Sequence, residues 1–136
     1  MTRLCLDMSA YSHFKRGAPE AVHAIASASS VAIPVIVLGE LRTGFRLGRR
    51  FAENEHEILS FLAQPLVRVL EVDDEAASIY AEIVSALRQA GTPIPTNDIW
   101  IATLAVRDGS KVLTYDEHFT LIHRLGTELL KRSPTH

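Results

Sequence analysis

Residues 4–7 of this 136-residue chain read LCLD, three apolar side chains that end at Asp7. A short apolar run of this kind is typical of a strand that is buried on both faces of a parallel sheet. An acid directly after such a strand lies at its carboxyl end, where open parallel sheets bind their ligands. We therefore expect a strand over residues 4–6, followed by an N-cap at Ser9 for a short helix that reaches Phe14.

Apolar runs and helical periodicities alternate along the rest of the chain. Strand composition recurs at residues 31–33, 67–70 and 111–114, and a weaker edge strand is expected at 129–130. Helical spacing is expected over residues 20–28, from 35 onward, over 51–62, between the caps Asp73 and Gly91, and over 97–106 and 117–125. Such alternation predicts an α/β fold with a central, mainly parallel sheet of four to five strands and helices on both faces.

Length and composition limit the class of protein. The chain has 47% apolar and 22% charged residues, which is ordinary globular composition, and its length fits one domain over residues 1–136. A lone cysteine, Cys5, excludes a disulfide scaffold and favours a reducing cytoplasm. Neither a secretory signal nor an apolar run of about 20 residues is visible, so we expect neither export nor a membrane partner.

The net charge of −2 conceals an uneven distribution. Residues 1–50 contain seven Lys and Arg against three Asp and Glu, whereas residues 51–136 contain seven against thirteen. A basic region attracts phosphates even when the total charge is negative.

Four arginines in the basic half have helical spacing, namely Arg42, Arg46, Arg49 and Arg50. They share one helical face if the helix continues through Gly44 and Gly48. Such a face either binds RNA phosphates or is simply a solvated helix surface.

Four acids lie where a strand or loop is followed by a helix. They are Asp7 in LCLDMSAY, Glu40 in VIVLGELRTG, Asp98 in PTNDIWIA and Asp116 in KVLTYDEHF. Converging carboxylates repel one another unless a cation holds them together, and oxygen ligands suit Mg²⁺ or Mn²⁺. A divalent cation in an acidic pocket is suited to phosphodiester chemistry, so the residues predict a metal-dependent nuclease.

Each acid also has a purely structural interpretation. Glu40 can pair with Arg42 or Arg46, Asp98 can act as a helix cap, and Asp116 can stabilise a turn. Asp7 has no evident capping role, because Ser9 is available. We expect His118, two residues after Asp116, to fill a turn rather than to contact a substrate.

Taken in order, the four acidic blocks resemble the PIN-domain family and, within it, the VapC-type toxins of type II toxin–antitoxin systems. The resemblance covers nearly the whole chain, from LDMSAY to LTYDEHF. It implies a three-layer α/β/α sandwich and an Mg²⁺- or Mn²⁺-dependent endoribonuclease. It further implies an RNA substrate, a small cognate antitoxin, and a homodimer or a toxin–antitoxin hetero-oligomer.

By position, Asp7, Glu40, Asp98 and Asp116 match the catalytic and metal-binding acids of that family. Thr114 matches a small polar residue whose hydroxyl can bond a carboxylate. Ser9 stands where the family often has asparagine, and retains a shorter hydrogen-bonding group. The resemblance implies that water attacks the phosphorus and leaves a 5′-phosphate and a 3′-hydroxyl.

Two other functions compete with the nuclease. A receiver-like phosphoacceptor module fits the length and the α/β alternation. It requires an acidic pair after the first strand, where this chain has only Asp7, and a lysine after the last strand. A non-catalytic PIN-like interaction domain would not need the four acids.

Overall fold

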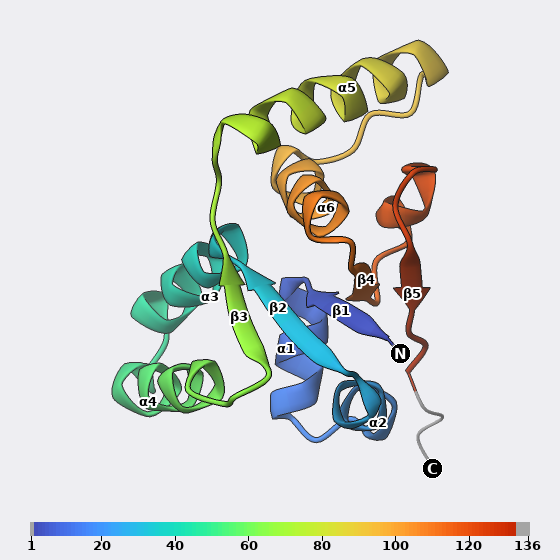
Figure 1. Ribbon diagram of the computed structural model, residues 1–136. Coiled ribbons are helices and arrows are strands. Elements are labelled where there is room, and N and C mark those ends of the chain that lie inside the picture. Colours follow the sequence, from blue (N-terminus) through green and yellow to red (C-terminus); the bar gives the residue numbers. More distant parts are fainter. Residues whose placement is uncertain (1, 133–136) are drawn as a thin grey trace.

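A parallel sheet forms the centre of the computed structural model, which describes residues 2–132 (Figure 1). Within this range five strands are arranged in the order β3-β2-β1-β4-β5, and every neighbouring pair is parallel. The strands are β1 (Arg3–Leu6), β2 (Ser30–Pro34), β3 (Val67–Leu70), β4 (Lys111–Thr114) and β5 (Thr127–Leu129). The predicted α/β class is confirmed, including the edge strand, which begins two residues earlier than expected.

Helices connect the strands and cover the sheet. They are α1 (Met8–Lys15), α2 (Pro19–Ser27), α3 (Val35–Leu47), α4 (Phe51–Leu62), α5 (Asp74–Ala90), α6 (Thr96–Asp108) and the 3₁₀ helix η1 (Glu117–Leu121). Right-handed crossovers place α1, α2 and α4 on one face of the sheet and α6 on the other. Figure 1 shows α5 on the outer side of α6, away from the sheet.

Burial explains the order of the strands. In β1 the side chains of Leu4, Cys5 and Leu6 are at most 1% exposed, and most of β2 and β4 is equally buried. The edge strand β3 is less buried, because Arg68 and Val69 are both exposed, Val69 at 39%, and only Leu70 is buried. Apolar runs therefore occupy the centre of the sheet, where helices exclude water from both faces.

The topological switch point of the sheet lies between β1 and β4, at their carboxyl ends. The chain leaves β1 towards β2 on one side and leaves β4 towards β5 on the other, so the strand order reverses between them. Such a switch point is where open α/β sheets bind ligands. Leu6 pairs in register with Leu113, and the backbone N–H of Asp7 donates to the Leu113 carbonyl at 3.4 Å. Asp7 therefore lies beside the segment that follows β4.

Two expected helix boundaries were wrong. Asp7, and not Ser9, is the N-cap of α1, because its backbone is extended and its side chain accepts from the Ala10 N–H. The helix expected over residues 117–125 is a shorter 3₁₀ helix, capped by Asp116 and ending at Leu121.

The prediction that the four arginines share one helical face was also wrong. Helix α3 ends at Leu47, so residues 49 and 50 lie in the connection to α4 rather than on the α3 surface. Arg42 pairs with Glu55 at 3.0 Å. The guanidinium of Arg46 lies 5.0 Å from the centre of the Phe51 ring. Arg50, which precedes α4, pairs with Glu53. The break in the helix therefore gives these side chains separate surroundings.

None of the helices in residues 2–132 combines the length and the apolar character that crossing a bilayer requires.

The burial pattern predicts unequal effects of one substitution on two strands. Val112→Ala, in the fully buried β4, should lower the free energy of unfolding by about 2 kcal/mol, because it removes buried methyl groups and leaves a cavity. Val69→Ala, on the exposed edge strand, should lower it by less than about 1 kcal/mol. Urea denaturation of both variants measures the difference, and equal losses would contradict the assigned burial.

Candidate active site

Asp7 is held in a defined orientation at the end of β1, where it is only 5% exposed. Its Oδ1 accepts hydrogen bonds from the Ser9 hydroxyl at 2.8 Å and the Ala10 N–H at 2.9 Å, and its Oδ2 accepts from the Thr114 hydroxyl at 2.5 Å. Burial raises the pKa of Asp7 and outweighs these three bonds, which favour the carboxylate. Each carboxylate oxygen has about two lone pairs, so Oδ2 keeps one for another ligand.

Two hydroxyls connect Asp7 to the chain beyond β4. Thr114 Oγ1 accepts from the Asp116 N–H at 2.9 Å, and Ser9 Oγ accepts from the Tyr115 N–H at 3.1 Å. Because each hydroxyl already accepts from an N–H, its single proton is directed to Asp7. Ser9 and Thr114 thus join the start of α1 to the end of β4.

Glu40 and Asp98 come from α3 and α6. Asn97 Nδ2 donates to Glu40 Oε2 at 3.4 Å, which links the two helices near the switch point. Burial raises the pKa of Glu40, and the charge of Asp7 raises it further. Asp98 lies in the first turn of α6, whose N-terminus carries no side-chain cap.

The four carboxylates influence one another. Burial raises the pKa of Asp98 to about 6, and repulsion from Asp116, Asp7 and Glu40 adds to this effect. The ring of His118 acts in the opposite direction. The structure therefore brings the four predicted acids into one region, although they come from four separate segments.

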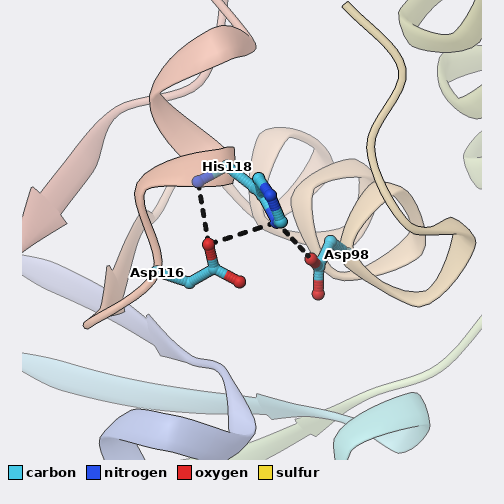
Figure 2. Close-up of side chains that lie close together, drawn as sticks. All are labelled: Asp98, Asp116 and His118. Carbon is cyan, nitrogen blue, oxygen red and sulfur yellow. Dashed lines mark hydrogen bonds and ion pairs between the residues drawn. The ribbon is translucent and has the colours of Figure 1, made fainter.

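His118 is a member of this site that the sequence did not reveal. Figure 2 shows its ring between Asp98 and Asp116, with Nδ1 at 3.7 Å from Asp98 Oδ2 and 3.2 Å from Asp116 Oδ1. Its backbone N–H also donates to Asp116 Oδ1 at 2.9 Å. The sequence predicted that His118 fills a turn rather than contacting a substrate; the structure adds that its ring lies beside Asp98 and Asp116 while its backbone belongs to η1. The DEHF spacing was the available signal, because a side chain two residues beyond an acid can turn back towards it.

These side chains fit a divalent cation. Within residues 2–132, none of the four carboxylates forms an ion pair with a lysine or an arginine, and their negative charge is opposed only by His118. One ligand atom each from Asp98, Asp116 and His118 can be chosen so that all lie within 4.8 Å of one another. Clustered carboxylates without a fixed counter-charge have the donor chemistry that hard dications prefer.

A parallel α/β sheet with carboxylates gathered at its switch point defines a class of candidate metal-binding proteins. The family model for the PIN domain matches residues 4–125. The chain therefore belongs to the PIN-domain family.

Relatives of known identity agree with this assignment. Ribonuclease VapC4 of Mycobacterium tuberculosis is 31% identical over 87 residues, which cover 64% of this chain and 67% of that protein. The DNA-bound VapBC structure from Salmonella typhimurium aligns with a TM-score of 0.81 at 25% identity, covering 94% of this chain and 98% of that chain. VapBC-5 of M. tuberculosis, from a toxin–antitoxin family, aligns with a TM-score of 0.73 at 27% identity, covering 96% and 99%.

Substitutions at two buried threonines test whether the Thr114 hydroxyl bridges Asp7 and the backbone of Asp116. Thr114→Val should lower the free energy of unfolding by about 1–3 kcal/mol, because Asp7 Oδ2 and the Asp116 N–H lose their partner. Thr103→Val is the matched control. Thr103 is also fully buried, but its hydroxyl has no hydrogen-bond partner in the part of the chain that is described. The control should be neutral or slightly stabilising in denaturant titrations, and a similar loss in both variants would contradict the bridge.

The raised pKa of Asp98 predicts that the stability of the metal-free protein depends on pH. The pKa of Asp98 is about 6 when folded, above the ordinary value of 3.8 for this side chain, so the folded state binds this proton more tightly. The free energy of unfolding should therefore fall as pH rises through this window, by at most about 3 kcal/mol from this group. Asp98→Asn should remove much of that slope and raise the Tm near neutral pH.

Thermal unfolding in EDTA between about pH 3.5 and pH 7 measures the slope. Asp74→Asn is the control, because Asp74 is an exposed acid in the first turn of α5 and should leave the slope unchanged. If the slope were unaltered in Asp98→Asn, the pH dependence of stability would come from another group, and the prediction would be wrong.

Proposed function

We propose that this protein is the toxin of a toxin–antitoxin pair, a single-domain endoribonuclease over residues 1–136 that hydrolyses RNA with Mg²⁺ or Mn²⁺. Asp7, Glu40, Asp98 and Asp116 are the proposed catalytic and metal-binding residues. The observation that carries the proposal is their convergence at the switch point, where burial and mutual repulsion raise the pKa values of Asp7, Glu40 and Asp98. Membership of the PIN-domain family and the similarity to ribonuclease VapC4 support it.

The chemistry divides between the cation and the chain. A divalent cation, when bound, acts as a Lewis acid towards phosphate oxygens and lowers the pKa of a coordinated water. Asp7 supplies a ligand whose orientation Ser9 and Thr114 hold. Asp98, Asp116 or both orient the attacking water or accept its proton. The raised pKa of Asp98 suits a proton acceptor near neutral pH. Attack by water leaves a 5′-phosphate and a 3′-hydroxyl.

The arginines of residues 42–50 are proposed as contacts for RNA phosphates, although they do not form one helical face. Arg42 pairs with Glu55 in a partly buried ion pair and Arg50 pairs with Glu53 in an exposed one, and an RNA phosphate can compete for both arginines. Arg46 and Arg49 are exposed and have no carboxylate partner among the ion pairs of residues 2–132. Contacts of this kind position RNA without reading its sequence.

An antitoxin is the proposed protein partner. A depression of about 540 Å³ lies between α1, α2 and α4, and its apolar lining includes Phe14, Ile25, Phe61 and Leu66. Such a surface suits an apolar antitoxin segment. An antitoxin arginine that reaches the carboxyl ends of the strands would neutralise the four acids. The solved VapBC structures with similar folds support a partner of this class. A homodimer, or a hetero-oligomer with the antitoxin, belongs to the same proposal.

The strand order contradicts one of the two competing functions but not the other. A receiver-like module requires the strand order 2-1-3-4-5, whereas this sheet has the order 3-2-1-4-5, so that alternative was wrong. A non-catalytic interaction domain remains an alternative, but it gives no reason for four repelling acids to be gathered together.

Asp7→Asn and Asp98→Asn test the nuclease proposal. Each removes one charged ligand while preserving the size of the side chain, so each should lower kcat/KM for RNA cleavage at least about a hundredfold. Both variants should fold, since burial of these carboxylates raises their pKa values and the neutral amide removes that penalty.

Cleavage of labelled RNA with and without EDTA, together with Mn²⁺ titration of the Trp100 fluorescence, measures both effects. Asp74→Asn, outside the site, should cleave as the wild type does. Undiminished cleavage in EDTA, or in either site variant, would refute the proposal. A folded wild-type protein that neither binds Mn²⁺ nor cleaves RNA would favour the non-catalytic domain.

A further inference from the structure

A hydrogen bond of its own backbone and the packing of the next residue fix the position of His118. Its backbone N–H is bonded to Asp116, and the next residue, Phe119, is completely buried in the core. The ring itself is half exposed, at 51%, and directs Nδ1 towards Asp98 and Asp116 (Figure 2). A side chain anchored in this way can serve as a ligand without reordering the backbone.

The spacing of the three side chains suits six-coordinate binding. Ligand atoms around a cation of the size of Mg²⁺ lie about 3 Å apart when adjacent and about 4.2 Å apart when opposite. Nδ1 of His118 lies 3.2 Å from the Asp116 oxygen and 3.7 Å from the Asp98 oxygen. Both separations fall within that range, so small side-chain movements suffice to bring all three atoms onto one ion.

The chemical nature of the donor affects which ion is preferred. Mg²⁺ binds oxygen ligands almost exclusively and gives up its water reluctantly. First-row transition ions bind imidazole more readily, and Mn²⁺ is the weakest binder of that series. A site with one imidazole among its carboxylates is therefore less suited to Mg²⁺ than an all-oxygen site would be.

The geometry points to His118 as a nitrogen ligand of the cation at Asp98 and Asp116, and so as the residue that makes this site favour Mn²⁺ over Mg²⁺. The inference rests on the proposed function only in requiring a divalent cation at these acids. A histidine that merely paired with the two aspartates would instead compete with every cation equally and would create no preference.

His118→Asn is the informative substitution. Asparagine places an amide oxygen close to the position of Nδ1, so it changes the type of donor atom while keeping a donor there. His123→Asn is the matched control, because His123 is an exposed histidine and is not one of the cluster residues. Both variants and the wild type are used as the full chain, without RNA.

Two measurements test the inference with Mn²⁺ and Mg²⁺ as the probes. Competition titrations followed by the EPR signal of free Mn²⁺ give the ratio of the two affinities, and pulsed EPR of bound Mn²⁺ detects a coordinated ¹⁴N nucleus. His118→Asn should reduce the preference for Mn²⁺ at least about tenfold and abolish the ¹⁴N coupling, while Mg²⁺ binding persists. His123→Asn should match the wild type in both measurements.

Absence of ¹⁴N coupling in the wild type would overturn the inference, even if the variant did not fold. An unchanged affinity ratio in a folded His118→Asn protein would also overturn it. RNA cleavage is recorded separately. A nitrogen-ligated Mn²⁺ in a protein that cleaves no RNA would support the inference while refuting the proposed function. Cleavage supported by a site with no nitrogen ligand would do the reverse.

Discussion

Repulsion among four carboxylates is the constraint on which the functional part of this structure depends. The sheet brings Asp7 and Asp116 to its switch point, and α3 and α6 add Glu40 and Asp98. Burial and like charge raise pKa values there, so folding places these groups in a less favourable environment than water. A bound cation would relieve that cost, so the proposed metal binding would be linked to stability.

The hydroxyls of Ser9 and Thr114 make the arrangement specific. Each accepts an N–H from the segment after β4 and donates to Asp7, so neither can turn away without leaving a buried group unpaired. The carboxylate is thereby oriented by backbone positions rather than by another charge. A neutral scaffold of this kind leaves the negative charge of Asp7 available to a cation, whereas an arginine partner would cancel it.

Much of the fold could be predicted because its signals are local. The strands at 67–70 and 111–114 and the helix over 51–62 have the expected bounds, and Asp73 and Gly91 cap α5 as expected. The errors arose where competing local signals were equally good. Asp7 rather than Ser9 caps α1, because only Asp7 has the extended backbone that a cap requires. The four arginines do not share one helical face, because α3 ends at Leu47.

By itself, the sequence determined the alternation of strands and helices and the positions of Asp7, Asp98 and Asp116 at the end of a strand or the start of a helix. These features follow from the periodicity of neighbouring residues, which acts over one element at a time. Only the tertiary structure decided that the acids, with Glu40 in the second turn of α3, lie in one region, that two hydroxyls orient Asp7, and that His118 faces Asp98 and Asp116. Those relations join segments as much as 107 residues apart, and they depend on strand order and on where each helix ends, which local periodicity does not encode.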